Sequence, residues 1–281
     1  MNLKQIFMVS GAIVLTVAIY FVPKVQSKTK EKPEKDSLST PAPIDFIAVA
    51  KKAIDTKELE KIESLEKMIT LATATDKKIS FLDSLVKLWD TARKPEASAF
   101  VSEQIAITGN KPEHWYNAAD RYMMATRFTK ENTEKSQLYQ NARKCFEKTL
   151  QMQPENLNAK AGLGVCFVES AGLTGEPPMK GIALLKEVVE KDSTQINAQV
   201  NLGYFSIQSG QFDKAISRFE TVLRIKPEFF EAYLYLSDAY EKMGKIDMAI
   251  KNLEIYQSKL TDPVLIGEVQ NYINELKSKT S

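Results

Sequence analysis

The feature of this sequence that most limits its possible folds is an internal repeat near the C-terminus. Two consecutive segments, beginning at Ile196 and Phe230, carry matching residues at a constant offset of 34 positions. The matched pairs are Leu202 with Leu236, Gly203 with Ser237, Gly210 with Gly244, Ala215 with Ala249, and Phe219 with Leu253. A fixed period of about 20 to 50 residues is typical of proteins in which each unit packs against its neighbours. We therefore expect an array of similar units instead of one globular core.

The order of large and small residues within the period resembles the tetratricopeptide repeat. That family's pattern is a bulky residue, Leu-Gly-x2-Tyr, a turn, Ala-x3-Phe and a closing proline. The first segment matches it at Leu202-Gly203, Gly210, Ala215-x3-Phe219 and Pro227, and the second adds Tyr233, Leu236-Ser237-x2-Tyr240, Gly244 and Ala249-x3-Leu253. The resemblance implies an all-α fold, a right-handed superhelix of stacked helix-turn-helix hairpins with a concave groove.

The pattern has a physical basis in how two helices of one hairpin pack. Small residues at Gly203 and Ala215 allow the helices to approach closely, and a large residue such as Phe219 fills the space beside them. Gly210 and Gly244 fall in the turns, where a positive φ costs little only for glycine. Pro227 follows a helix that it cannot continue.

The pattern continues toward the N-terminus in a weaker form. One unit has Leu163-Gly164-x2-Phe167 and Gly181-x3-Leu185, with Asp192-Ser193 where the proline would stand, and another has Trp115, Ala119, Tyr122, Ala142-x3-Phe146 and Pro154. Compared with the 12 residues from Gly203 to Ala215, these units carry five and 11 extra residues. We expect the extra residues in the turns, near 171–180 and 127–138. A further, degenerate unit is indicated by Phe81, Leu85, Leu88 and Ala97-x3-Val101.

These patterns divide the folded part of the chain into three. Residues 44–76 are predicted to form N-terminal helices, either a cap or a decayed unit, since apolar residues recur on one helical face from Leu59 to Ile69. Residues 77–262 are predicted to form the solenoid of about four to five units, clearest over 196–229 and 230–262. Residues 263–281 are predicted to form an amphipathic capping helix, whose polar face would close the open end of the stack.

The N-terminus is predicted to be a membrane anchor. Ile6–Val22 is a run of 17 residues without a charge, which would span about 25 Å as a helix, close to the thickness of the hydrocarbon core. A cleaved signal peptide and a buried core helix are the alternatives. Residues 1–25 are therefore assigned to a transmembrane helix, and the Lys-, Glu- and Pro-rich residues 26–43 to a flexible linker. The five lysines between Lys24 and Lys35 favour a cytoplasmic position for the rest of this single-pass protein in the cytoplasmic (inner) membrane.

Several function classes are disfavoured by composition. The net charge of +2 gives no basic footprint for nucleic acid. His114 is the only histidine, and Cys145 and Cys166 lack CxxC spacing, so we expect no metal site. The two cysteines are expected to be free thiols, with a disulfide between them as the alternative. No nucleotide-binding loop or catalytic triad motif occurs, and we expect neither a cofactor nor an enzymatic activity.

The resemblance also implies where partners bind, because the first helices of successive units line the groove in this family. The matching positions are Tyr116, Asp120, Met123, Val165, Asn197, Asn201, Tyr204, Gln208, Glu231 and Asp238. The Lys and Arg residues with which some members hold a partner's C-terminal carboxylate are missing at these positions. We expect a membrane-tethered scaffold or adaptor that binds other proteins or peptides in the groove. The alternatives are a structural subunit of a larger membrane or envelope complex, and a chaperone-like holder of membrane or exported proteins.

Overall fold

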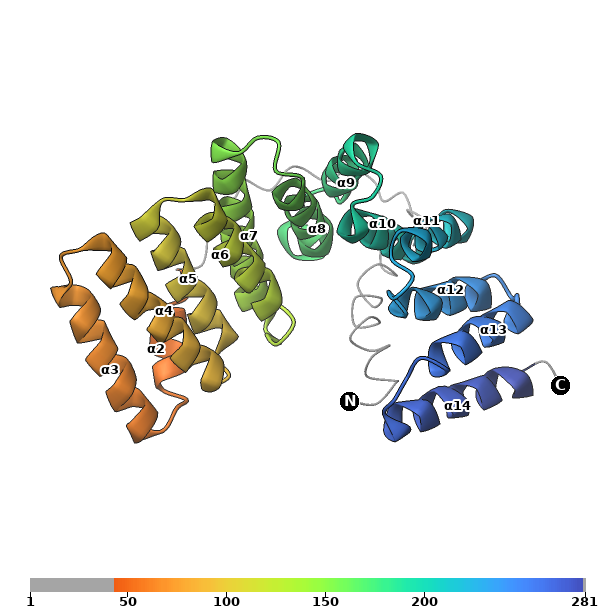
Figure 1. The fold of residues 1–281 in the computed structure, drawn as a ribbon, viewed down its shortest axis with the longest axis horizontal. Helices are drawn as coiled ribbons and strands as arrows, with labels where there is room; N and C mark the ends of the chain where they lie inside the picture. The colour runs from red at the N-terminus through yellow and green to blue at the C-terminus, as the bar shows by residue number, and fades with distance from the viewer. Residues whose placement is uncertain (1–42, 280–281) are drawn as a thin grey trace, which may run out of the picture. The chain divides into compact units, whose positions relative to one another are not determined.

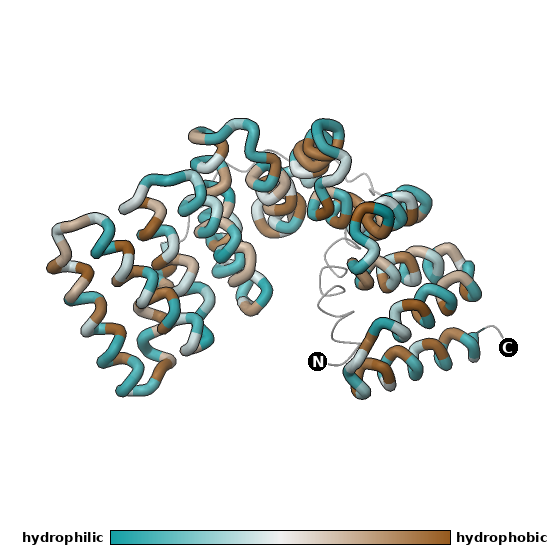
Figure 2. Tube along the Cα trace, in the orientation of Figure 1, coloured by the Kyte–Doolittle hydropathy of each residue, from teal (hydrophilic) through white to brown (hydrophobic). Residues whose placement is uncertain are grey.

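The computed structural model describes residues 43–279 of the 281-residue chain. This part contains thirteen α-helices and no strand. It forms two compact units, one of residues 43–149 with 172–174, and one of residues 150–171 and 175–279. Figure 2 shows hydrophilic and hydrophobic residues alternating along each helix, the pattern of helices that bury one side. Each unit is built from antiparallel helical hairpins, as the repeat predicts.

The first unit contains six helices, with α7 continuing past its end (Figure 1). They are α2 (Phe46–Lys51), α3 (Thr56–Leu71), α4 (Thr75–Thr91), α5 (Pro95–Gly109), α6 (Pro112–Ala125) and α7 (Asn132–Met152). Consecutive helices from α3 to α6 pack side by side, and α2 packs against α5. Residues 44–76 thus contain two whole helices, α2 and α3, and the first residues of α4. Asp45 and Asp55 cap the starts of α2 and α3 by each accepting a backbone N–H.

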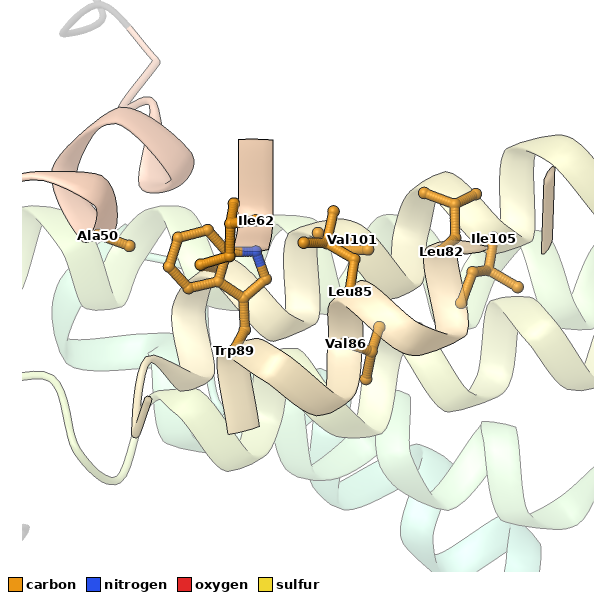
Figure 3. Close-up of a cluster of buried hydrophobic side chains, with 9 residues drawn as sticks. Ala50, Ile62, Leu82, Leu85, Val86, Trp89, Val101 and Ile105 are labelled. Atoms are coloured by element: carbon orange, nitrogen blue, oxygen red, sulfur yellow. The ribbon is translucent and has the colours of Figure 1, made fainter. Parts of the chain in front are cut away.

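The core of the first unit is centred on Trp89, which is fully buried (Figure 3). Ile62 of α3 and Val101 of α5 belong to the same cluster, together with Ala50, Leu82, Leu85, Val86, Ala97 and Ile105. The N-terminal end of the unit is attached to α7 by two hydrogen bonds. Ile44 N–H donates to Gln137 Oε1 at 2.8 Å, and Gln137 Nε2 donates to the Ile44 carbonyl at 3.2 Å. Ile44, just before α2, is therefore held next to a long helix.

The second unit contains the clearest repeats. Its helices are α8 (Leu157–Thr174), α9 (Met179–Lys191), α10 (Ile196–Gln208), α11 (Phe212–Ile225), α12 (Glu231–Lys242), α13 (Ile246–Gln257) and α14 (Pro263–Ser278). Gly203 of α10 lies against the ring of Phe219 of α11, so closely that an added Cβ would come within 2.7 Å of Cζ. Gly210 and Gly244 have φ of 73° and 72° in the turns that follow α10 and α12. The roles predicted for these glycines are confirmed.

Two repeat units, those with Trp115 and with Leu163, carry extra residues that were predicted to lie in the turns. Most of these residues lengthen helices instead. α8 has 18 residues where its counterpart α10 has 13, so the five extra residues lengthen the helix. α7 has 21 residues where its counterpart α11 has 14, and only the remaining extra residues extend α6 and the turn after it. In α7 the reason is local, because the added first turns include Glu134, Lys135 and Gln137, which continue a helix readily.

The repeat unit that lacks a closing proline has Asp192 at that position, just before the next repeat unit begins. The Asp192 carboxylate accepts from the Thr194 backbone N–H at 2.9 Å, from the Thr194 hydroxyl at 2.6 Å and from Gln195 Nε2 at 2.9 Å. These bonds hold the chain in a turn just before α10. They also lower the pKa of Asp192, because hydrogen bonds favour the ionised carboxylate.

The predicted anchor (1–25) and all but the last residue of the predicted linker (26–43) lie outside the described residues, as do residues 280–281. Between residues 43 and 279, no helix combines the length and the apolarity that a membrane crossing requires. At the other end, α14 buries Val269, Ile273 and Leu276 in a cluster with α13, as an amphipathic last helix should.

Candidate functional site

The residues predicted to line a groove fall on two units. Tyr116, Asp120 and Met123 lie on α6 of the first unit. The other seven lie on the second unit: Val165 on α8, Asn197, Asn201, Tyr204 and Gln208 on α10, and Glu231 and Asp238 on α12. All ten are exposed or half-buried, and none belongs to the buried core. Side chains at these positions are therefore available at the surface of each unit.

In the second unit, tyrosines of successive first helices meet. The ring of Tyr204 on α10 contacts the ring of Tyr235 on α12 edge to face, with centroids 6.3 Å apart. Tyr235 in turn stacks on the buried Phe219, at 4.8 Å between centroids and 12° between planes. Aromatic pairs in such arrangements add to stability beyond the area they bury. The core thus fixes Tyr235, which then supports Tyr204.

Sequence reasoning missed Tyr235, although the repeat itself marks it. Tyr235 stands 34 residues after Asn201, one of the predicted groove positions, and so occupies the equivalent place in the next unit. Carrying the offset through every position would have found it.

Carboxylates surround these tyrosines. Burial and the nearby Glu169 and Tyr235 raise the pKa of Tyr204 to about 12, so its hydroxyl stays protonated at neutral pH. A hydrogen bond joins Tyr204 to Gln208. Burial also raises the pKa of Asp238, against the opposing effect of Lys242, whose Nζ lies 3.5 Å from Oδ1. Asp238 is therefore a partly desolvated carboxylate beside the tyrosine rings.

The last helix adds a third tyrosine to the same surface. Tyr272 of α14 donates its hydroxyl proton to Glu241 Oε2 on α12, and Lys279 Nζ lies 2.9 Å from Glu241 Oε1. The pKa of Tyr272 is raised by burial, by Glu241 and by Asp238. Asp238 thus lies within electrostatic reach of both Tyr204 and Tyr272. We call this surface the tyrosine face and define it by Glu169, Tyr204, Tyr235, Asp238, Glu241 and Tyr272.

The predicted residues of the first unit form a smaller surface. Tyr116 packs edge to face on Phe146 of α7, with centroids 5.9 Å apart. Its pKa is raised by burial and by Asp120 one helical turn away. Met123 is half-buried on the same helix. This set offers an aromatic ring, a carboxylate and a thioether, without the continuity over several helices that marks the tyrosine face.

A buried polar cluster joins three helices of the first unit. The Tyr122 hydroxyl on α6 donates to Glu103 Oε2 on α5 at 2.6 Å, and Lys144 Nζ on α7 donates to Glu103 Oε1 at 3.1 Å. Glu103 is only 6% exposed and Tyr122 is fully buried. Sequence reasoning missed this cluster, although a glutamate in the apolar stretch from Ala97 to Ala106 was a visible signal. Its partners show that it connects helices within the fold.

A surface hollow and the two cysteines remain to be described, and neither includes any of the ten predicted groove residues. A shallow hollow of about 470 Å³ between α3 and α4 is lined by Glu60, Lys61, Ser64, Leu65, Met68, Ser84 and Leu88. Cys145 and Cys166 are buried free thiols, and burial raises the pKa of Cys145. The disulfide alternative is therefore wrong.

Comparison with known proteins supports the repeat. Residues 206–262 match the model of the family described as tetratricopeptide repeat. No curated protein sequence matches the chain. Among solved structures, a tetratricopeptide repeat protein from Parabacteroides merdae has a TM-score of 0.56 at 16% identity, over 82% of this chain and 87% of that one. A thermophilic repeat protein of Thermus thermophilus has a TM-score of 0.53 at 14% identity, over 72% and 98%.

MamA from Desulfovibrio magneticus RS-1 is also similar, with a TM-score of 0.50 at 18% identity, over 67% of this chain and all of that one. Likenesses at such low identity concern the fold alone. Together with the family match and the 34-residue period, they show that the chain has an all-α fold of the tetratricopeptide type.

Proposed function

We propose that this protein is a membrane-tethered scaffold that binds another protein or peptide on the tyrosine face. The observation that carries the proposal is the edge-to-face contact of Tyr204 on α10 with Tyr235 on α12, beside the half-buried carboxylates Asp238 and Glu241, the second of which accepts a hydrogen bond from Tyr272 on α14. Tyrosine is a rigid side chain with an apolar ring and a polar tip, and it is enriched where proteins bind proteins. All three tyrosines pack with part of their rings on the core and remain half-buried, so each also keeps part of its surface accessible.

The proposed mechanism is binding and tethering, without a chemical step on the partner. A partner held on the face of a membrane-anchored chain stays close to the bilayer, so its local concentration there rises without any further contact. The proposed tether is the apolar run of residues 6–22, and the lysines that follow it favour the cytoplasmic side of the inner membrane for the folded units. In this proposal the protein is not an enzyme and uses no cofactor.

A structural subunit or a chaperone-like holder is less well supported. Permanent burial against other subunits, or holding of unfolded chains, calls for a broad exposed apolar patch. The most exposed large apolar residues, each at least 60% exposed, stand at four separate places along the described chain: Leu71, Phe128, Met179 and Val264. Single exposed apolar residues are normal on a soluble surface.

Crosslinking of the full-length protein in its native membrane tests the scaffold proposal. The test variant carries Tyr204→Ala, and the control carries Met248→Ala, which removes an exposed side chain of α13. We expect specific partners that the control keeps and the test variant loses, while circular dichroism shows both folded. Partners that are unchanged in the test variant would place binding elsewhere and favour the structural-subunit alternative.

The tether is tested separately from binding. Deleting residues 6–22 should move the protein from the membrane fraction to the supernatant after alkaline extraction, whereas the full chain should remain with the membrane. A full chain that is extracted as readily as the deletion variant would rule out an anchor. This result would leave the binding proposal untouched.

A further inference from the structure

The charges of the tyrosine face are unbalanced. Three of its six residues are carboxylates, and Glu275 of α14 lies near enough to raise the pKa of Tyr272. Two lysines pair with these groups: Lys242 with Asp238 at 3.5 Å, and Lys279 with Glu241 at 2.9 Å. Asp238, Glu241 and Glu275 thus place three carboxylates beside two lysines, so this part of the face carries more negative than positive charge, although the whole chain has a net charge of +2.

Two lysines on α8 and α14 form ion pairs with α9 and α13, the helices that lie next to them in sequence. Lys160 of α8 pairs with Glu187 of α9 at 2.5 Å. Lys277 of α14 pairs with Glu254 of α13 at 3.7 Å. Between them, α10 carries no charged residue at all. Both lysines thus pair with carboxylates of the second helices.

The tyrosine rings, like the carboxylates, are suited to bind a cation. The face of an aromatic ring attracts a cation, most often the guanidinium of arginine, which also stacks on it. Tyr204 and Tyr272 are neutral at pH 7, because their pKa values lie above the ordinary value of 10, so each presents an uncharged ring to a bound cation. A carboxylate next to such a ring can then form the second contact with the same cation.

From these observations we infer that the tyrosine face binds an extended segment of another protein that carries several arginine or lysine side chains. This inference rests on the proposed scaffold function and adds the chemistry of the partner. Asp238 is the central contact, since it lies near two of the tyrosines and is already partly desolvated. Part of the cost of removing its water is therefore met by the fold, which leaves more of the attraction for the bound cation.

The geometry suggests a suitable probe. Neighbouring packed helices lie about 8 to 10 Å apart, and an extended chain advances about 3.1 to 3.4 Å per residue. A cation at every third residue would therefore reach successive first helices. The probe is a blocked, fluorescent peptide of about twelve residues with arginine at every third position. Its matched control has citrulline, which keeps the shape of arginine without the charge.

Binding is measured by fluorescence anisotropy with the full-length protein in detergent. We expect the arginine peptide to bind at least ten-fold more tightly than the citrulline peptide, and to weaken as salt is added. Asp238→Asn and Glu241→Gln should each weaken binding several-fold. Asp247→Asn, which removes an exposed carboxylate from α13, should have no effect and serves as the matched control.

Three results would overturn the inference. The citrulline peptide binding as tightly as the arginine peptide would exclude recognition by charge. Asp238→Asn binding the arginine peptide as well as the wild type, while remaining folded, would exclude Asp238 as the central contact. Tighter peptide binding after deletion of residues 24–35 would show that this chain's own lysine-rich segment is the occupant. If the arginine peptide fails while crosslinking still depends on Tyr204, the scaffold function stands and only the partner chemistry is wrong.

Discussion

The buried contact between Tyr122 and Glu103 should contribute more to stability than the ion pair beside it. Tyr122→Phe removes only the hydroxyl, which donates to Glu103 Oε2 at 2.6 Å, and leaves the ring in a fully buried site. The Glu103 side chain, 8% exposed, then loses one of its two hydrogen-bond donors and gains little water in exchange. Lys144 remains at 3.1 Å, but its side chain is 61% exposed.

The size of the effect follows from burial. A hydrogen bond to a charged group contributes about 1.5 to 3 kcal/mol, and an orphaned buried acceptor costs a similar amount. We therefore expect Tyr122→Phe to lower the free energy of unfolding by about 2 to 3 kcal/mol. Lys144→Met removes a cation that solvent already screens, and should cost less than about 1 kcal/mol. Tyr116→Phe, whose ring keeps its contact with Phe146, is the matched control and should stay within about 0.5 kcal/mol.

Urea unfolding of the full-length variants in detergent, followed by circular dichroism, measures these differences. The denaturant slope must be the same in all variants, because repeat proteins can unfold in parts and the comparison then fails. Tyr122→Phe costing no more than Tyr116→Phe would refute the reasoning, and so would Lys144→Met costing as much as Tyr122→Phe. Either result would mean that the interior of the first unit is wetter at Glu103 than its burial indicates.

Three further predictions concern the second unit. Gly210→Ala should lower the free energy of unfolding by about 1 to 2 kcal/mol, because φ is 73° there. Gly267→Ala, inside α14 with open space for the added Cβ, should raise it by up to about 1 kcal/mol. Equal effects of the two substitutions in urea unfolding would contradict this. Phe219→Ala should cost about 3 to 5 kcal/mol, and Met248→Ala, at an exposed site, less than about 0.5 kcal/mol in the same assay. Asp238→Asn should be more stable than the wild type at neutral pH, because the raised pKa of Asp238 means that its ionised form destabilises the fold. This gain in the free energy of unfolding should vanish below the ordinary pKa of 3.8. A gain that is larger at pH 3 than at pH 7 would contradict the prediction.

Residue types at fixed spacing were enough to predict the hairpins of the second unit. The close approach of Gly203 to Phe219 and the positive φ of Gly210 each require one kind of residue at one place, so their physical causes are visible in the sequence. The length of α7 and α8 was not visible in this way. The family pattern led us to place every added residue in a turn, whereas most of the added residues lengthen α7 and α8.

The candidate site was only partly predictable for a related reason. Repeat positions identified the first helices, on which Tyr204 and Asp238 lie half-buried, and their role in binding stays a prediction. The role of Tyr272 depends on how α14 packs on α12 and α13, which no spacing within α14 reveals. Glu103 was missed because its partners come from α6 and α7, up to 41 residues away in the chain.

Photocrosslinking from single positions of the second unit tests the central claim most directly. A photoreactive amino acid is placed at Asn197 on α10, or at Lys214 on α11, in the full-length protein in its native membrane; both side chains are exposed, but only Asn197 belongs to a first helix. The account predicts crosslinks to another protein from Asn197 and none from Lys214. Crosslinks from Lys214 alone would show that partners bind the opposite helices, and would contradict the assignment of the tyrosine face as the binding surface.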